Sequence, residues 1–447
     1  MITEVKWLNH PILGNLSLNF KKANGCPYNN IILAGENGTG KTTILETLMT
    51  FLNGGSFEPF EFIRYIANNN EIQITTRVEK EVVRLGYHIR HNNNTGTTEK
   101  VSSGKNNNFE RIKDDLFDLR HYGCAYSKAR SGFNTKKVTS VTTQQLDNEL
   151  YVDDSKDDFT DIKQLLVDID SQDNSDWMEI SLSKKGTTIE EFQQTSKLYR
   201  FKNSFNNFFD ELQFNKIDLH DTQEKKIVFN KNGKLIDIDS LSTGEKQVVF
   251  RGTHLLKNSR KINGGVVLVD EPELSMHPKW QEKILSFYQS LFTVGGNQTS
   301  QIIMATHSEY VVKEALKHPD DTLVIVLNNE NGLITPSNIV TPSHLPTITS
   351  AEVNYLAFGI LSNDYHIELY CYLQQREQMN TIKQVDDYIK SHPKYNVQLH
   401  QKLCTNPHGT TYETLPTYIR NAIDHPDSGN TFTPKELETS IMLLLSM

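Results

Sequence analysis

The residues best suited to chemistry form a glycine-rich segment at positions 35–43, and those that could contact a ligand are Gly35, Asn37, Gly38, Thr39, Gly40, Lys41, Thr42 and Thr43. The segment follows an apolar run and precedes a helical pattern, as a phosphate-binding loop of the form G-x-x-x-x-G-K-[ST] does. Glycines let main-chain N–H groups point at a phosphate chain. Lys41 is expected to reach the β- and γ-phosphates and Thr42 to hold Mg²⁺, with a helix N-terminus directed at the anion. The alternative is a glycine-rich turn that matches by chance, which the flanking patterns disfavour.

Two carboxylates follow a second apolar run. Residues 265–272 read Gly-Val-Val-Leu-Val-Asp-Glu-Pro, and four consecutive branched apolar residues are typical of a central parallel strand buried on both faces. Ligands of α/β sheets bind at the carboxyl ends of such strands. Asp270 is therefore expected to hold Mg²⁺, through Thr42 or water, and Glu271 to polarise an attacking water. The alternative is a strand that ends in an acidic turn.

Two further segments could contact the same ligand. Residues 241–247 read Leu-Ser-Thr-Gly-Glu-Lys-Gln before an apolar helix, and Ser242, Gly244 and Glu245 there form a candidate second anion site. A serine and a glycine before a helix are more commonly only a cap. His307 follows another apolar run, at 301–305, and could contact a γ-phosphate and report its loss. A lone histidine at this position would more commonly be a structural cap.

In this order the motifs resemble those of soluble AAA-family ATPases of the ABC type, with SMC-like and OLD-like heads, over roughly residues 1–330. By this resemblance, residues 35–42 are the Walker A loop and residues 241–247 are the signature. Residues 266–271 are the Walker B strand with its following glutamate, residues 273–277 are the D-loop, and His307 is the switch histidine. It implies ATP and Mg²⁺ as cofactors and Glu271 and His307 as catalytic residues. It also implies a homodimer or higher homo-oligomer, in which Ser242 of one protomer faces the γ-phosphate held by Lys41 of another.

Two details qualify this resemblance. Thr243 and Glu245 replace the glycine and glutamine of transporter signatures, which points away from membrane transport. The family also implies a glutamine that contacts Mg²⁺ between the two lobes of the head. Gln144 and Gln145 are candidates for it.

Composition bounds the remaining classes of protein. A chain of 447 residues is long enough for two or three domains, and its net charge of −9 argues against broad coating of nucleic acid or anionic membrane. The four cysteines have no metal-binding spacing, as in reduced proteins. The chain shows neither a basic-then-apolar leader nor an apolar run near ~18 residues. We therefore expect a soluble, cytoplasmic protein with no membrane partner.

These patterns predict an α/β fold with two domains. An ABC-type P-loop head with a mixed sheet flanked by helices is expected at residues 1–345, and a helical partner-binding domain at 346–447. The head is expected to contain a first lobe at about 1–135, a helical insertion at about 136–225, and a lobe with the signature and Walker B strand at about 226–345. The aromatic stripe within residues 189–213 has helical spacing and is expected to be core.

A short motif near the end of the chain suggests a second chemistry. Arg420 and His425, separated by four residues, resemble the R-x(4–6)-H motif of HEPN ribonucleases, in which the arginine stabilises phosphate charge and the histidine acts on the 2′-hydroxyl. The alternative is structural: Arg420 pairs with nearby carboxylates, and His425 and Pro426 end a helix. A degenerate HEPN-like fold used for docking is the third interpretation.

The whole layout resembles the ATPase subunit of Septu antiphage systems, including the versions that serve as retron effectors. That resemblance implies a separate HNH nuclease subunit as partner, and nucleic acid or retron components as further partners. Three functions follow as hypotheses: a regulatory ATPase that controls a partner nuclease, an ATP-gated ribonuclease, and a DNA-repair ATPase of the ABC type.

Overall fold

The computed structural model divides the chain into two compact units, residues 1–338 and 339–447. It describes residues 1–78, 81–82, 86–102, 109–154, 158–183, 186, 188–218, 224–406 and 408–447. The second unit begins at residue 339, where the sequence predicted a boundary at 346. No helix among these described residues is long and apolar enough to cross a membrane.

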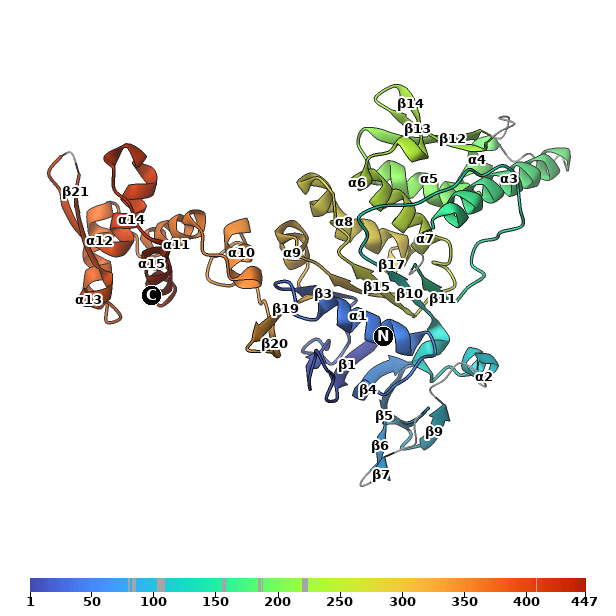
Figure 1. Ribbon diagram of the computed structural model, residues 1–447, viewed down its shortest axis with the longest axis horizontal. Coiled ribbons are helices and arrows are strands. Elements are labelled where there is room, and N and C mark those ends of the chain that lie inside the picture. The colour runs from blue at the N-terminus through green and yellow to red at the C-terminus, as the bar shows by residue number, and fades with distance from the viewer. Residues whose placement is uncertain are drawn as a thin grey trace. The chain divides into compact units, whose positions relative to one another are not determined.

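A seven-stranded sheet forms the centre of the first unit, the head (Figure 1). Its strands follow the spatial order β11 (Tyr151–Asp153), β10 (Cys124–Ser127), β15 (Val266–Asp270), β18 (Gln301–Ala305), β3 (Asn30–Ala34), β19 (Thr322–Glu330) and β20 (Leu333–Asn338). All neighbours are parallel except β19 and β20. Every residue of β3, β15 and β18 is buried, which explains their unbroken apolar sequences. The predicted α/β fold class is confirmed.

A second, antiparallel sheet packs near the chain start. Its order is β2 (Ser17–Asn19), β1 (Ile2–Trp7), β4 (Phe60–Ala67), β5 (Asn70–Thr75), β8 (Tyr87–Asn92) and β9 (Thr98–Ser102), with a small hairpin of β6 (Arg77–Val78) and β7 (Glu81–Val82) beside it. Helix α1 (Lys41–Leu52) buries Ile44, Leu48 and Phe51 in one apolar core with side chains of both sheets. The helix that begins at the phosphate loop is thus held on two sides.

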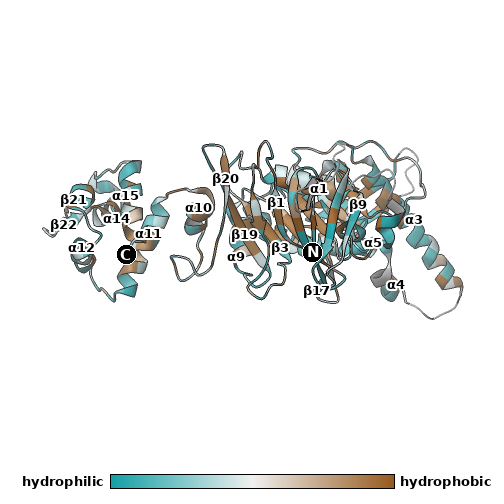
Figure 2. Cartoon of the chain, turned by 90° about the horizontal axis from the view of Figure 1, so that it is seen from below, coloured by the Kyte–Doolittle hydropathy of each residue, from teal (hydrophilic) through white to brown (hydrophobic). Residues whose placement is uncertain are grey.

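Helices cover the rest of the head. They are α2 (Phe109–Asp114), a 3₁₀ turn (Leu119–Tyr122), α3 (Thr160–Leu182), α4 (Ile189–Thr195), α5 (Lys197–Phe208), α6 (Thr243–Lys246), a π-helical turn (Gln247–Arg251), α7 (Gly252–Leu256), α8 (Pro278–Leu291) and α9 (Glu309–Leu316). Small sheets join them: β12 (Leu212–Asp218), β13 (Lys226–Lys231) and β14 (Lys234–Asp237), and β16 (Thr293–Val294) with β17 (Asn297–Gln298). Figure 2 shows β3 and β19 as largely hydrophobic and the outer helix α3 as largely hydrophilic.

The aromatic stripe within residues 189–213 is core. Phe201, Phe205 and Phe208 of α5 are buried. Phe208 packs against Phe287 and Phe205 against Phe229, so the stripe joins α5 to α8 and β13. The α5 part of the stripe is thus core, as the helical spacing predicts.

The described residues of the second unit form helices and one hairpin. Its elements are α10 (Ser350–Phe358), α11 (Asn363–Arg376), α12 (Ile382–Ser391), α13 (Val397–His400), β21 (Gln401–Thr405), β22 (Thr411–Thr414), α14 (Leu415–Asp424) and α15 (Pro434–Leu445). A separate core that includes Tyr365, Ile389, Ile419 and Ile441 holds them together. The predicted capping box of the last helix is present, since the Thr433 hydroxyl accepts from the N–H of Glu436 at 3.2 Å.

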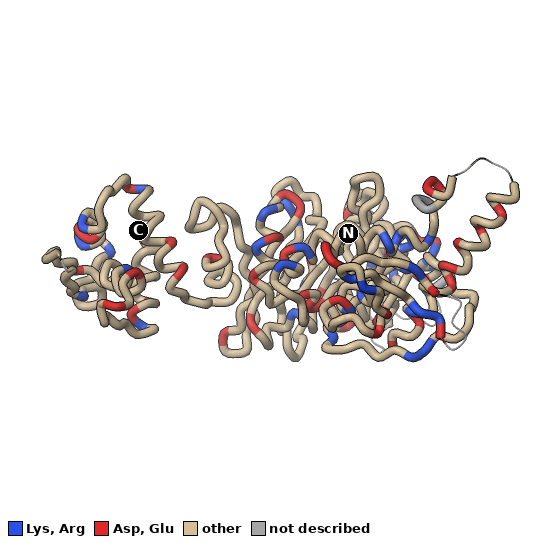
Figure 3. The backbone as a smooth tube through the Cα atoms, turned by 90° about the horizontal axis from the view of Figure 1, so that it is seen from above, with Lys and Arg blue, Asp and Glu red and all other residues tan. Residues whose placement is uncertain are grey.

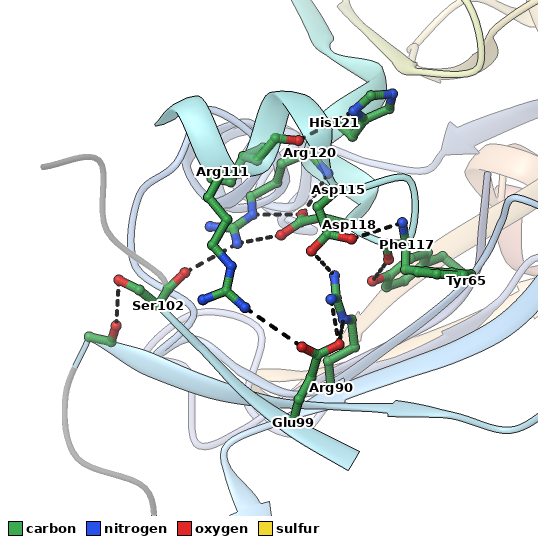
Figure 4. Close-up of polar contacts among 12 residues, drawn as sticks. Tyr65, Arg90, Glu99, Ser102, Arg111, Asp115, Phe117, Asp118, Arg120 and His121 are labelled. Carbon is green, nitrogen blue, oxygen red and sulfur yellow. Dashed lines mark hydrogen bonds and ion pairs between the residues drawn. The ribbon is translucent and has the colours of Figure 1, made fainter. Parts of the chain in front are cut away.

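A buried polar network ties the antiparallel sheet of the head to the following loop (Figure 4). Arg90 on β8 pairs with Glu99 of β9 at 2.5 Å and with Asp115 at 2.7 Å. Arg120 is fully buried and pairs with Asp118 at 2.7 Å, while the Asp118 carboxylate also accepts from the Arg120 N–H at 2.9 Å. Burial alone would raise the pKa of Asp118, but the hydrogen bonds and charge of Arg120 lower it.

We predict that Arg120→Met destabilises the head by about 3–5 kcal/mol, because it leaves the buried Asp118 carboxylate without its partner. Urea denaturation measures the loss. Adding Asp118→Asn, which keeps the N-cap acceptor but removes the charge, should restore part of it. Lys136→Met breaks the exposed ion pair with Asp158 and should leave the stability nearly unchanged, because solvent screens exposed ion pairs. Equal losses in Arg120→Met and Lys136→Met would contradict the prediction.

We also predict that the head loses stability as pH falls from about 6.5. Burial lowers the pKa of His88 to about 3, from an ordinary value of 6.5. Between these values the unfolded chain binds a proton at His88 that the folded head excludes, so acid favours unfolding by about 1.4 kcal/mol per pH unit. The free energy of unfolding, measured against pH, should fall less steeply in His88→Asn. An unchanged slope would show that His88 is not the group concerned.

Candidate functional site

The phosphate loop curls around the ammonium group of Lys41. Its Nζ donates to the carbonyl oxygens of Gly35 and Glu36, both at 2.8 Å, and lies 3.2 Å from the Thr39 hydroxyl. Gly35 has φ +127°, and a Cβ there would lie 2.4 Å from the carbonyl oxygen of Leu327. Only glycine therefore fits. Burial lowers the pKa of Lys41 to about 8, although the nearby carboxylates oppose the change.

Thr42 and Asp270 face each other. The Thr42 hydroxyl lies 3.0 Å from Oδ2 and 3.2 Å from Oδ1 of Asp270. Burial raises the pKa of Asp270 to about 6, with a further contribution from the Glu271 charge and opposition from the Thr42 hydrogen bond. Hydroxyl and carboxylate oxygens are ligands that Mg²⁺ prefers. The pair therefore fits Mg²⁺, which would supply positive charge beside the phosphates when bound.

Glu271 and His307 form the second pair at this edge of the sheet. The His307 Nε2 lies 3.4 Å from Oε1 of Glu271, and a hydrogen bond from His307 lowers the pKa of the Glu271 carboxyl. Glu271 has φ +42°, a strained backbone for a residue with a side chain. Its N–H donates to the Ala305 carbonyl at 2.9 Å. The carboxylate is thus held between two neighbouring strand ends.

Glu273, in the D-loop, fixes the backbone beside His307. Its Oε1 accepts from the Thr306 hydroxyl at 2.8 Å and from the His307 N–H at 2.7 Å. The sequence motif placed Glu273 in the D-loop but predicted no such contact. A carboxylate that bonds a backbone group far along the chain leaves no local sequence signal.

The signature segment starts a helix and lies apart from α1 in Figure 1. Ser242 is the N-cap of α6, where its hydroxyl and N–H each lie 2.8 Å from Oε2 of Glu245. The other carboxylate oxygen of Glu245 pairs with Lys231 at 2.6 Å. A Cβ on Gly244 would lie 2.6 Å from the Ser275 carbonyl oxygen, so the D-loop rests on the signature. Within this protomer Glu245 acts as a cap, and its predicted nucleotide contact stays a prediction.

The structure thus brings most predicted residues together at one edge: the loop residues Gly35, Asn37, Gly38, Thr39, Gly40, Lys41, Thr42 and Thr43 with Asp270, Glu271 and His307. Thr42 and Thr43 lie in the first turn of α1, for which Gly40 is the N-cap at φ +81°. Ser242, Gly244 and Glu245 stand elsewhere on the head, on α6.

The two candidate glutamines are held in another region. The Gln144 N–H lies 3.3 Å from Asp168 Oδ2, and its carbonyl accepts from Gln172 at 2.7 Å. Gln144 and Gln145 line a cavity of about 270 Å³ to which no phosphate-loop residue contributes among the described residues. The strand beside the Asp270 strand is β10, and it is followed by Lys128, whose Nζ lies 3.6 Å from Glu46 of α1. Residues that follow β10 are therefore better placed than either glutamine to contact Mg²⁺ beside Asp270.

Arg420 and His425 lie in the second unit and line one cavity of about 470 Å³. Arg420 is paired with Asp424 at 2.6 Å. His425 is the C-cap of α14, and Pro426 follows it. The ion pair and the helix end agree with the structural alternative, and the shared cavity agrees with a ligand site.

One protein family matches most of the head. The model of the family described as "AAA domain, putative AbiEii toxin, Type IV TA system" matches residues 31–313. That range starts in β3 and includes the phosphate loop, the signature, Asp270, Glu271 and His307.

Two curated relatives are similar to parts of the chain. One is "Retron Vc95 probable ATPase" of Vibrio cholerae serotype O1 biovar El Tor, 25% identical over 351 residues, which are 64% of this chain and 66% of that protein. The other is "Retron Ec83 probable ATPase" of Escherichia coli, 33% identical over 94 residues, which are 19% of this chain and 16% of that protein. The chain thus spans just under two thirds of the first relative and far less of the second.

Two solved structures have a remote similarity. One is the crystal structure of the SmcHead bound to the C-winged helix domain of ScpA, with 14% identity, a TM-score of 0.39, and coverage of 76% of this chain and 98% of that chain. The other is the SMC head domain from Thermotoga maritima, with 14% identity, a TM-score of 0.38, and coverage of 76% and 99%. Scores this low carry no argument about function.

We predict that Lys41→Ala weakens binding of ATP with Mg²⁺ on the order of 100-fold, because charged hydrogen bonds to phosphate contribute about 1.5–3 kcal/mol. Titration calorimetry measures the affinity. Lys6→Ala, which removes a half-exposed lysine of β1 paired with Glu61, is the control and should keep most of the affinity. Equal affinities for Lys41→Ala and the wild type would refute the role of this lysine.

Proposed function

The chain belongs to the family of AAA-domain proteins whose model matches residues 31–313, and from this we propose that it is a Mg²⁺-dependent ATPase. Membership confirms the predicted class, an AAA-family ATPase domain. The observation that carries the proposal is the Thr42–Asp270 pair beside the buried Lys41 and the Glu271–His307 pair. A hydroxyl, two carboxylates, a lysine and a histidine at the end of a parallel sheet are the groups that phosphoryl transfer to water requires.

Each side chain then has a role. Lys41 and the loop N–H groups bind the phosphates, while Thr42 and Asp270 hold Mg²⁺. Glu271 orients and polarises the attacking water, since its lowered pKa keeps it ionised. His307, whose Nε2 lies 3.4 Å from Glu271, would contact the γ-phosphate and respond to its loss.

Nucleotide binding is proposed to join two heads. Because α6 stands apart from α1 in the same chain (Figure 1), Ser242 would complete a nucleotide site by contacting a second protomer. The capping hydroxyl and the N-terminus of a continuous helix would then meet the γ-phosphate. We propose a homodimer or a higher homo-oligomer, located in the cytoplasm.

The biological role that we propose is regulation within a prokaryotic antiphage defence complex. The relatives named as retron ATPases support this role, and so does the overall resemblance to Septu ATPase subunits. In this proposal the ATPase controls a separate HNH nuclease, the second unit binds that partner, and retron components or nucleic acid join the complex. Copurification of the chain with the product of a neighbouring HNH gene tests this. Absence of a stable complex would contradict it.

A second candidate function is ribonuclease activity, which the shared cavity of Arg420 and His425 favours. Arg420 is already paired with Asp424, which weighs against a role for this arginine in binding phosphate. Under this alternative, Arg420→Ala and His425→Ala would abolish cleavage of RNA. Under the regulatory function both variants would leave defence intact.

We predict that Glu271→Gln binds ATP with Mg²⁺ but hydrolyses it at least about 100-fold more slowly, because an amide cannot accept the proton of the attacking water. ATP should then hold the protomers together, which light scattering at size-exclusion detects. Glu46→Gln on the exposed face of α1 is the control and should hydrolyse ATP normally. Hydrolysis by Glu271→Gln at the wild-type rate would overturn the assigned role.

A further inference from the structure

The guanidinium group of Arg251 lies against the carboxyl edge of the central sheet, although this residue belongs to the helix that follows the signature. Its Nη2 donates to the Asp270 carbonyl at 2.6 Å and its Nη1 to the Glu271 carbonyl at 3.1 Å. Nε donates to the Ser127 hydroxyl at 2.8 Å, and Nη2 also donates to the Ser127 carbonyl at 3.0 Å. One side chain therefore joins the ends of β10 and β15 to a helix.

Among the residues that the structure describes, no carboxylate accepts a hydrogen bond from the buried, charged side chain of Arg251. Its exposed fraction is 0%, and its hydrogen bonds among the described residues go to neutral oxygens, including the Gln247 side-chain oxygen at 3.5 Å. Burial of a charge is costly and is normally offset by a paired ion. Here the cation lies behind the backbone that carries Asp270 and Glu271, where it reduces the repulsion between the two carboxylates.

The arginine is connected to the signature by one continuous helix. Ser242 caps α6, the π-helical turn Gln247–Arg251 follows, and α7 continues it. π-turns inside helices are frequent at functional sites. The Gln247 amide donates to the Arg130 carbonyl, which holds this turn against the segment after β10. A shift of Ser242 along the helix axis would therefore move the backbone of Arg251.

The group that Arg251 holds is also the strained one. Glu271 has φ +42°, a conformation that costs energy and persists only where surrounding contacts hold it. Its N–H is bound by Ala305 and its carbonyl by Arg251. Displacing either contact would change the direction of the Glu271 carboxylate.

We propose that Arg251 is a positioning residue that transmits closure of the signature on a neighbouring protomer's nucleotide to the backbone of Asp270 and Glu271. The inference rests on the proposed function, because it requires Ser242 to contact nucleotide in another protomer. The Glu271 carboxylate reaches its catalytic orientation when the helix that begins at Ser242 has bound the neighbouring protomer's nucleotide. Hydrolysis is thereby restricted to heads that have closed.

Arg251→Lys tests the inference, because lysine keeps the charge but its compact ammonium group cannot span the separate oxygens of Ser127, Asp270 and Glu271 that the planar guanidinium group binds together. We expect kcat for ATP to fall on the order of 100-fold, while the affinity for ATP with Mg²⁺ stays within about threefold. The variant should accumulate as an ATP-bound dimer that does not turn over. Arg120→Lys, at an equally buried arginine in the Asp118 pair, is the matched control and should keep the wild-type kcat.

Ser127→Ala provides a second variant should Arg251→Lys fail to fold. It removes the acceptor of Nε but leaves the arginine, and it should lower kcat on the order of tenfold with dimerisation unchanged. A wild-type kcat in the folded variants would overturn the inference, as would a parallel loss of ATP binding and kcat. Neither result bears on Glu271. Normal hydrolysis by Glu271→Gln would instead refute the proposed function.

Discussion

Parallel pairing of three buried strands is the constraint on which the site depends. In the registers of β15, β18 and β3, Asp270 is paired with Ala305 and Ala305 with Leu33, so the three strands end together. The phosphate loop, the two carboxylates and His307 follow these ends directly. Backbone hydrogen bonds between the strands thus bring together groups that are far apart in sequence.

Burial acts on both the acidic and the basic side chains at the carboxyl edge of the sheet. Carboxylates and Lys41 share a low-dielectric setting in which burial moves the pKa of Asp270 up and that of Lys41 down. Behind them, Arg251 supplies a further positive charge through backbone carbonyls. Figure 3 shows Lys and Arg interspersed with Asp and Glu over the rest of the head.

The sequence was sufficient for the elements that combine a strong local pattern with a motif. Unbroken apolar runs predicted β3, β15 and β18, and the residues after them predicted the edge. It could not reveal Arg251 or Glu273, whose contacts join residues that are not neighbours in the chain and follow no periodic pattern. Gln144 and Gln145 were candidates by residue type alone, without a positional pattern. The strands β21 and β22 are short, so the sequence predicted only helices in the second unit. The role of a residue that depends only on tertiary contacts could not be predicted from the sequence.

The close approach of Gly244 to Ser275 has a consequence for assembly. Without a side chain at 244, the carbonyl of the D-loop lies directly on the signature helix, and the left-handed backbone of Ser275 keeps it there. The signature and the D-loop are therefore in direct backbone contact. In a homodimer of the kind proposed above, a neighbouring copy that contacts the start of the signature helix would also lie close to the D-loop.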